Sequence, residues 1–356
     1  GVAGVQTCAL PISGHLFDYQ RWVIDRALER ERFAAFLTTG LGKTAVQLEW
    51  ARLVTQRHQG RTLIVCPLNI VAQTIGEAAR FYEDGLTVAD LRDRATFDEW
   101  LVSGGGGGIT NYEKLDAVES RLPVDAVVLD ESSVLKNCNG KRRNALMDAF
   151  RGVRWKLACS ATPAPNDRVE YAEHAYWLET VRSTREFLAA FFVNRDGNWQ
   201  LKAHGRKAFY RHLAGWSVFM IDPKAYRFDH DADLPPLNVE FPHVSATEEQ
   251  MNEARGWESG EQASLFGATP GGITSRTKMM QIANGFILDG DARRFASHKP
   301  DEVVRLVTEQ HPDDQCIVWV TFDVEGDALA ERIPDSMHLS GRTKVSVRDR
   351  SEEHTS

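Results

Sequence analysis

The sequence lacks several features that would assign its class at once. No apolar run reaches the roughly 18 residues that a membrane-spanning helix needs, so we expect no membrane segment. The 5 cysteines form no CxxC pair, which speaks against structural zinc and a disulfide framework and favours a reducing, cytoplasmic setting. Basic residues are also in deficit: 42 Lys and Arg face 50 Asp and Glu, a net charge of −8. This balance excludes a strongly basic nucleic-acid binder but leaves room for a local basic groove.

The composition is that of an ordinary globular protein. Hydrophobic residues make up 42% of the chain and charged residues 26%, which excludes global disorder and supplies enough apolar material for a buried core. A length of 356 residues favours two domains.

The two ends of the chain differ from the interior. The chain begins without Met, and Gly1–Ser13 has no basic region of a signal peptide. Arg350–Ser356 can be encoded by a DNA string whose reverse complement, in a shifted frame, encodes Thr7–Ile12; the string is similar to a common sequencing-library adapter. We therefore expect residues 1–13 and 350–356 to be artefacts, and the interior to be a fragment of a longer gene.

Short apolar runs alternate with helical patterns along the interior. The runs that we expect to form buried strands are 33–37, 62–66, 109–112, 126–129 and 157–159. Helical spacing is present in 16–29 and 45–59. Such alternation predicts an α/β fold, with a mainly parallel sheet and helices on both of its faces.

A second series of the same kind begins late in the chain. The apolar run 316–322 is expected to be a strand, and the helical pattern 325–332 follows it. The rigid Leu234-Pro-Pro-Leu237 segment suits a boundary, so we place one lobe at 14–232 and a second, truncated lobe at 233–349. The glycine run 104–108 has no Lys after it and predicts a flexible surface turn rather than a phosphate cradle.

A glycine-rich loop lies between the first expected strand and the helix that follows it. In Gly40-Leu-Gly42-Lys43-Thr44 the glycines allow backbone N–H groups to converge on phosphate oxygens, and the helix N-terminus adds its positive dipole. Lys43 would reach the β and γ phosphates of ATP, and the Thr44 hydroxyl would bind Mg²⁺. The full phosphate-loop pattern is broken, because Leu37 stands where its first glycine belongs. A helix that merely starts after a glycine turn is the alternative.

Two carboxylates end the strand 126–129. At the carboxyl edge of a parallel sheet, Asp130 would hold Mg²⁺ and Glu131 would orient and polarise the attacking water. A solvated acidic turn is the alternative for these two residues alone. Together with Lys43 in this chain order, they favour nucleotide hydrolysis.

An ordered series of motifs resembles the superfamily 2 helicases, and within them the Swi/Snf-like DNA translocases. The motifs that carry the resemblance are Leu16–Gln20, Thr39–Thr44, Leu63–Leu68, Ile109–Glu113, Asp130–Ser133 at the DEAD/DEAH-box position, Leu135–Asn137, Ser160–Pro163, Ile317–Phe322 and Leu339–Thr343. The resemblance covers nearly the whole interior. It implies a RecA-like P-loop NTPase lobe followed by a second, truncated RecA-like lobe.

The resemblance also implies roles for single residues. Gln20 would bind the adenine edge, and Thr39 belongs to the nucleotide-binding loop with Gly40 and Gly42. Ser160 and Thr162 would couple ATP hydrolysis to DNA movement. Together with Lys43, Thr44, Asp130 and Glu131, these residues make up the expected site for ATP binding and hydrolysis.

Two departures from the family pattern stand out. Ser133 replaces the His or acidic residue that usually ends the second motif. Nothing after Arg350 resembles motif V, or motif VI with its arginine fingers, which stabilise charge on the departing phosphate. We therefore expect residues 14–349 to bind ATP·Mg²⁺ but to hydrolyse it slowly, with or without DNA.

The resemblance implies an ATP-driven motor that translocates on DNA or remodels it, with DNA held mainly through its backbone and without sequence preference. Basic Lys141–Arg143 could touch a phosphate backbone, although an exposed helix start explains it equally. The aromatic and basic run 209–216 could stack on DNA, but its helical spacing favours lobe core. Three alternatives to the motor stay open: a strand-separating helicase, a nucleotide-dependent DNA-binding subunit without turnover in a restriction or repair assembly, and, more distantly, a P-loop kinase.

Overall fold

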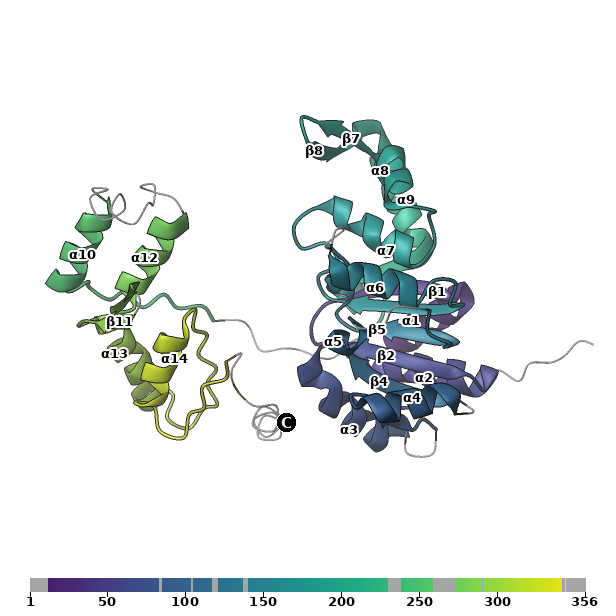
Figure 1. The fold of residues 1–356 in the computed structure, drawn as a ribbon, viewed down its shortest axis with the longest axis horizontal. Helices are drawn as coiled ribbons and strands as arrows, with labels where there is room; N and C mark the ends of the chain where they lie inside the picture. The colour runs from purple at the N-terminus through teal and green to yellow at the C-terminus, as the bar shows by residue number, and fades with distance from the viewer. Residues whose placement is uncertain are drawn as a thin grey trace, which may run out of the picture. The chain divides into compact units, whose positions relative to one another are not determined.

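The computed structural model describes residues 12–82, 85–103, 105–116, 121–136, 140–229, 238–258, 273–289, 291–340 and 343. The terminal segments 1–11 and 350–356 and the expected lobe boundary at 232/233 lie outside these residues. The chain divides into two compact units, Gly1–Leu234 and Pro235–Ser356 (Figure 1). No helix in the described part of the chain is long and apolar enough to cross a membrane.

The first unit is built on a seven-stranded sheet in the order β3-β4-β2-β5-β6-β1-β9. All of its strand pairings are parallel. The strands are β1 (Arg32–Leu37), β2 (Arg61–Cys66), β3 (Val88–Asp90), β4 (Gly106–Asn111), β5 (Ala126–Leu129), β6 (Trp155–Ser160) and β9 (Ser217–Met220). The expected parallel α/β lobe is confirmed.

Helices cover both faces of this sheet. Successive strand residues point to opposite sides, so apolar side chains line both faces and helices pack against each of them. In β1, Ala35 and Leu37 face one hydrophobic cluster, and Ala34 and Phe36 face the other. The first cluster includes residues of α1 (Asp18–Arg30), α2 (Lys43–His58) and α3 (Val71–Tyr82). The second includes residues of α4 (Arg94–Val102), α5 (Tyr112–Leu115), α6 (Lys141–Ala149), α7 (Tyr171–Trp177), α8 (Thr184–Phe191) and α9 (Arg206–Trp216).

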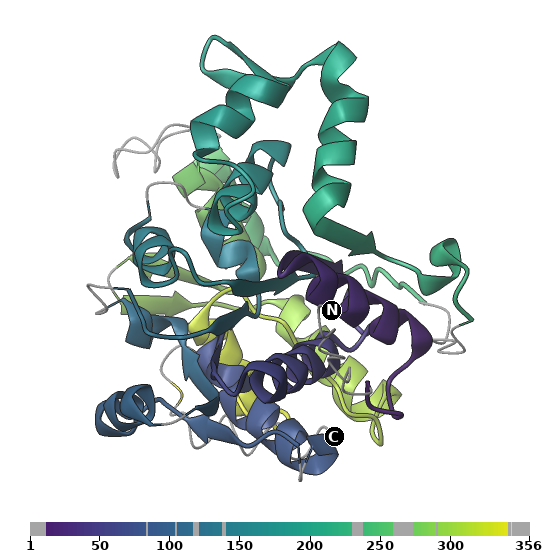
Figure 2. The ribbon, with the colours of Figure 1, turned by 90° about the vertical axis from the view of Figure 1, so that its right-hand side faces the viewer.

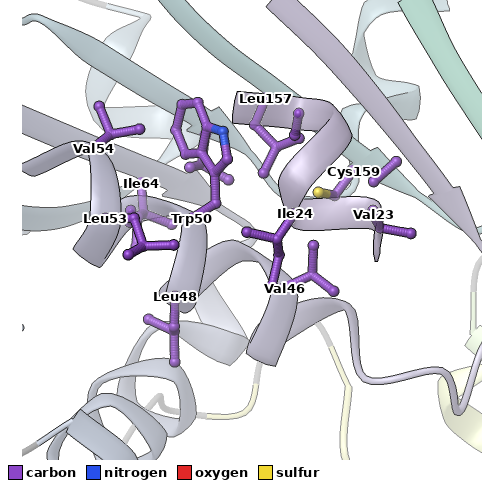
Figure 3. Close-up of a cluster of buried hydrophobic side chains, with 14 of the residues drawn as sticks. Val23, Ile24, Val46, Leu48, Trp50, Leu53, Val54, Ile64, Leu157 and Cys159 are labelled. Atoms are coloured by element: carbon purple, nitrogen blue, oxygen red, sulfur yellow. The ribbon is translucent and has the colours of Figure 1, made fainter. Parts of the chain in front are cut away.

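Helix α2 buries eight of its 16 residues and follows directly on the glycine loop. Trp50 of α2 is fully buried, and Figure 3 shows it among side chains from α1, α2, β2 and β6. Its neighbours in that view include Ile24, Val54 and Leu157. Because α2 is held along one side by these contacts, its N-terminus has a fixed position at the carboxyl edge of the sheet.

The glycine run does not form the surface turn that the sequence predicts. Gly106–Gly108 begin β4, which pairs with both β2 and β3. A Cβ at Gly108 would lie 2.4 Å from Leu91 Cδ1 and 2.9 Å from Trp100 Cε2. Glycine is therefore required at position 108 by close packing of side chains on the face of the sheet, not by a loop.

A two-stranded hairpin and its flanking helices project from the first unit. Strands β7 (Phe192–Arg195) and β8 (Asn198–Leu201) are antiparallel and lie between α8 and α9 in the chain. Figures 1 and 2 both show this segment standing away from the seven-stranded sheet.

The described residues of the second unit form four α-helices, one short π-helix (Leu306–Gln310) and one antiparallel pair of strands. The helices are α10 (Glu248–Glu258), α12 (Ile273–Ala283), α13 (His298–Arg305) and α14 (Asp323–Ala330), and the strands are β10 (Phe286–Asp289) and β11 (Asp291–Arg294). The expected helix 325–332 corresponds to α14. The expected strand 316–322 is wrong, since this segment is extended without strand pairing and Trp319 is 90% exposed.

Candidate nucleotide-binding site

The loop between β1 and α2 has the backbone shape that its glycines permit. Gly40 has φ +88° and Gly42 has φ +64°, both in the left-handed region. Gly42 precedes the first residue of α2 and has no side chain to cap the helix, so the N–H groups of the first turn are left for another acceptor. Thr39 is exposed beside Gly40. This is the arrangement that an anion at a helix N-terminus needs.

Lys43 and Thr44 occupy the first turn of α2. The Lys43 ammonium donates to the carbonyl oxygens of Leu37, at 3.3 Å, and Thr38, at 3.4 Å. The ammonium therefore lies against the loop that precedes its own helix. Both Lys43 and Thr44 are partly exposed, so an anion seated on the loop could reach them.

Asp130 follows β5 and is tied to the same helix. Its Oδ1 accepts a 2.6 Å hydrogen bond from Nε2 of Gln47, which is 1% exposed. Burial raises the pKa of the Asp130 carboxyl, while the Gln47 hydrogen bond and the Lys43 charge act to lower it. A bound cation would offset that burial and favour the carboxylate. Gln47 was missed by sequence reasoning, although it lies one helical turn after Lys43 on the same helix.

Glu131 accepts two hydrogen bonds on one carboxylate oxygen. Ser133 Oγ donates to Oε1 at 2.9 Å, and Ser160 Oγ donates to the same atom at 2.8 Å. Among the described residues no protein group donates to Oε2, which leaves that oxygen for water. Glu131 also has φ +53°, a left-handed conformation that costs a non-glycine residue about 1–2 kcal/mol. Strain of this kind is held by the surrounding structure and is common at functional sites.

The second and third motifs of the resemblance meet at Glu131. Ser160 ends β6, the neighbour of β5, and its Oγ also accepts a 3.0 Å hydrogen bond from the Thr162 N–H. Ser133 stands where the family has His or an acidic residue, and here it supplies an additional donor to Glu131. A movement of the Ser160–Thr162 loop would therefore change the hydrogen bonding, and so the position, of the Glu131 carboxylate.

Gln20 connects α1 to the glycine loop. Its Oε1 accepts from the Phe17 N–H at 3.0 Å, and its Nε2 donates to the Leu41 carbonyl oxygen at 3.2 Å. A Cβ at Gly42 would lie 2.4 Å from Gln20 Nε2. The side chain is thus in contact with the loop; its expected role in binding adenine stays a prediction.

Two further residues anchor the second motif from outside it. Buried Ser132 hydrogen-bonds His174 Nε2 of α7 at 3.1 Å, and burial lowers the pKa of His174 to about 4, so the imidazole is neutral near pH 7. The Tyr112 hydroxyl donates to the Asp130 carbonyl oxygen at 2.5 Å. Sequence reasoning missed His174 and named Tyr112 only as part of the Ile109–Glu113 motif, because nothing in the local pattern marks a contact over such a separation.

The described residues contain no group of three His, Cys, Asp or Glu side chains placed to hold a metal ion. A cation at this site would therefore depend on one carboxylate and one hydroxyl, completed by phosphate oxygens and water. Mg²⁺ is usually bound in this way in phosphoryl-transfer sites.

Comparisons with known proteins support the fold. No family model and no curated protein matches the sequence. The Sulfolobus solfataricus SWI2/SNF2 ATPase core in complex with dsDNA is similar in structure, with a TM-score of 0.52 and 18% identity over 91% of this chain and 71% of that chain. The ATPase core domain of the same organism gives 0.47 and 18%, over 78% of this chain and 58% of that chain. The UvsW helicase from bacteriophage T4 gives 0.36 and 14%, over 44% and 56%.

The likeness shows a fold rather than an activity, since the identity is low. The first unit has the fold of a RecA-like lobe, and over 91% of its length the chain has a fold similar to that of the SWI2/SNF2 ATPase core. In this fold ligands bind at the carboxyl ends of parallel strands. Lys43, Asp130, Glu131 and Ser160 all follow or end such strands.

Proposed function

We propose that this protein is an ATP-dependent motor that couples ATP hydrolysis to translocation on, or remodelling of, double-stranded DNA. The observation that carries the proposal is the junction of two strand ends, those of β5 and β6, with helix α2. The Asp130–Glu131 pair after β5 is hydrogen-bonded on one side to α2, through Gln47, and on the other to the end of β6, through Ser160. An isolated acidic turn would make neither contact.

The residues at and near this junction have separate roles in phosphoryl transfer. Lys43 and the N–H groups at the start of α2 bind the β and γ phosphates, with Gly40 and Gly42 allowing the backbone to approach. The Thr44 hydroxyl and the Asp130 carboxylate would hold Mg²⁺, which would supply positive charge to offset that of the phosphates. The free oxygen of Glu131 orients the attacking water and accepts its proton.

The DNA part of the proposal rests on the family resemblance and on the structural similarity to the Sulfolobus solfataricus SWI2/SNF2 ATPase core in complex with dsDNA. The Ser160–Thr162 loop supports coupling, because it contacts Glu131 directly and so can transmit a change between the catalytic carboxylate and a distant surface. Hydrolysis that depends on DNA requires such a connection.

The test is DNA-stimulated ATP hydrolysis together with displacement of a third strand from duplex DNA, carried out on the full-length protein. We expect both activities, and expect Glu131→Gln to remove both. Strand separation on forked DNA would instead identify a helicase. DNA binding that depends on ATP without any hydrolysis would identify a binding subunit and contradict the motor.

Gln20→Ala is expected to remove the preference for ATP over GTP. A side-chain amide can donate to one atom of the adenine edge and accept from its exocyclic amine, and guanine reverses that pattern. Competition between ATP and GTP for a fluorescent nucleotide measures the preference. Gln73→Ala, at an exposed glutamine of α3, is the matched control. An unchanged preference in Gln20→Ala would show that the side chain only ties α1 to the loop.

Gln47→Leu is expected to raise the Mg²⁺ concentration needed for ATP binding. The substitution keeps a buried side chain of similar size but removes the 2.6 Å hydrogen bond that orients Asp130. Loss of such an outer partner typically weakens metal affinity about 10–100-fold. Titration of ATP binding against Mg²⁺ measures the shift, and binding in excess Mg²⁺ should recover. A Mg²⁺ dependence equal to that of the unmodified protein would show that Asp130 does not hold the ion.

A further inference from the structure

The projecting segment of the first unit has a rigid aromatic base. The rings in this base pack edge-to-face or tilted, with centroids 5.1–6.2 Å apart, and belong to Phe187, Phe191, Phe192, Phe209 and His212. Phe187 and Phe209 are fully buried. We name the segment from Arg182 to His212 the basic projection. Its fixed base means that the surface it carries is presented in one orientation.

The charge of the basic projection is opposite to that of the chain. It contains seven Lys and Arg but two acidic residues, Glu186 and Asp196, so its formal net charge is 7 − 2 = +5, against −8 for the whole protein. A surface whose charge differs so strongly from its surroundings attracts an oppositely charged partner.

Helix α9 concentrates these cations on the face turned away from the core. Phe209, Leu213 and Trp216 are buried along one side of the helix, which confirms the expectation of lobe core for the run 209–216. The exposed side carries Arg206, Lys207, Tyr210 and Arg211. Residues 206 and 210 are one turn apart, as are 207 and 211, so the four side chains form two neighbouring rows.

The cations of this face differ from the arginines of the lobe that are paired with carboxylates. Arg142 is paired with Asp116 at 2.9 Å, and Arg143 with Glu173 at 2.6 Å, so the basic run 141–143 is largely occupied by protein carboxylates. Within the described part of the chain, no carboxylate lies within 4.0 Å of Arg206, Lys207 or Arg211. Their charge is therefore available to a partner.

We propose that this face of α9 binds the phosphate backbone of duplex DNA, outside the nucleotide site. The inference rests on the proposed function and adds a DNA-contacting surface to it. Arg and Lys bind phosphate oxygens, and a Tyr hydroxyl donates to them as well. A protein partner usually requires a central apolar patch, whereas Tyr210 is the sole large apolar side chain on this face.

The test replaces Arg206, Lys207 and Arg211 together by Gln in the full chain. Affinity for a fluorescent DNA duplex is measured by anisotropy over a series of salt concentrations. Each lost phosphate contact lowers the salt slope by about 1, so we expect a decrease of about 3 and binding weaker by roughly tenfold or more at low salt. Arg206→Lys with Arg211→Lys keeps the charge and should keep the slope. ATP affinity, measured alongside, should be unchanged.

The control replaces three exposed arginines on other helices of the lobe, Arg57, Arg80 and Arg94, by Gln, which removes the same charge. If the α9 variant matches this control in slope and affinity while both still bind DNA, the inference is wrong and the proposed function is untouched. If the unmodified protein binds no duplex DNA, both are wrong. Displacement of the DNA by polyglutamate as readily as by unlabelled DNA would assign the face to an acidic protein and overturn the inference.

Discussion

Replacing Lys43 by Ala is expected to remove measurable ATP·Mg²⁺ binding. The Lys43 ammonium lies against the glycine loop, held by the carbonyl oxygens of Leu37 and Thr38, where the phosphates of ATP would meet it. Loss of one partner from a hydrogen-bonded charge pair costs about 2–5 kcal/mol, which corresponds to binding weaker by roughly thirtyfold or more. Titration with a fluorescent ATP analogue measures the loss.

Lys141→Ala is the matched control for Lys43→Ala. Lys141 is an exposed lysine at the start of another helix, α6, and its removal changes the net charge by the same amount. We expect ATP affinity to be unchanged in this variant. Equal affinities in Lys43→Ala and Lys141→Ala would mean that the loop before α2 does not bind the nucleotide.

Glu131→Gln is expected to leave ATP binding intact and to lower hydrolysis at least roughly a hundredfold, the low end of what a general base contributes. The amide oxygen of Gln can accept the same hydrogen bonds from Ser133 and Ser160, so the local structure should be kept. What changes is the ability of the second oxygen to take a proton from water. Because we expect slow turnover, the rate is measured on radiolabelled ATP with protein in excess.

Ser160→Ala separates positioning from catalysis at the same carboxylate. It removes one of two donors to Glu131 Oε1 and leaves Ser133 in place, so its rate should lie between those of the unmodified protein and Glu131→Gln. Full activity in Glu131→Gln would show that another group activates the water and would remove Glu131 from the mechanism.

The local motifs were predictable from sequence because the chemistry needs their residues in a fixed order. The glycine loop, Lys43 and the Asp130–Glu131 pair each follow an apolar strand, and parallel strands bring their carboxyl ends to one edge. The alternation of strands and helices predicted the sheet for the same reason.

The contacts that complete the site were not predictable in this way. Gln47 and Asp130 are 83 residues apart, and Ser132 and His174 are 42 apart. Such pairs depend on how helices pack against the sheet, which no local pattern records. The prediction of a surface turn at the glycine run was wrong for a related reason. Leu91 and Trp100, which lie elsewhere in the chain, occupy the space that a side chain at Gly108 would need. The prediction of a strand at 316–322 was wrong because an apolar run is not sufficient for a strand, which also needs a neighbouring strand for its backbone hydrogen bonds.

The most direct test of the account is ATP binding and hydrolysis measured side by side in the unmodified protein, Lys43→Ala and Glu131→Gln. We predict that the unmodified protein binds ATP·Mg²⁺ and hydrolyses it, that Lys43→Ala does neither, and that Glu131→Gln binds without hydrolysing. That pattern would place phosphate binding at the glycine loop and water activation at the end of β5. Equal binding and equal hydrolysis in all three proteins would contradict the assignment of this site to ATP.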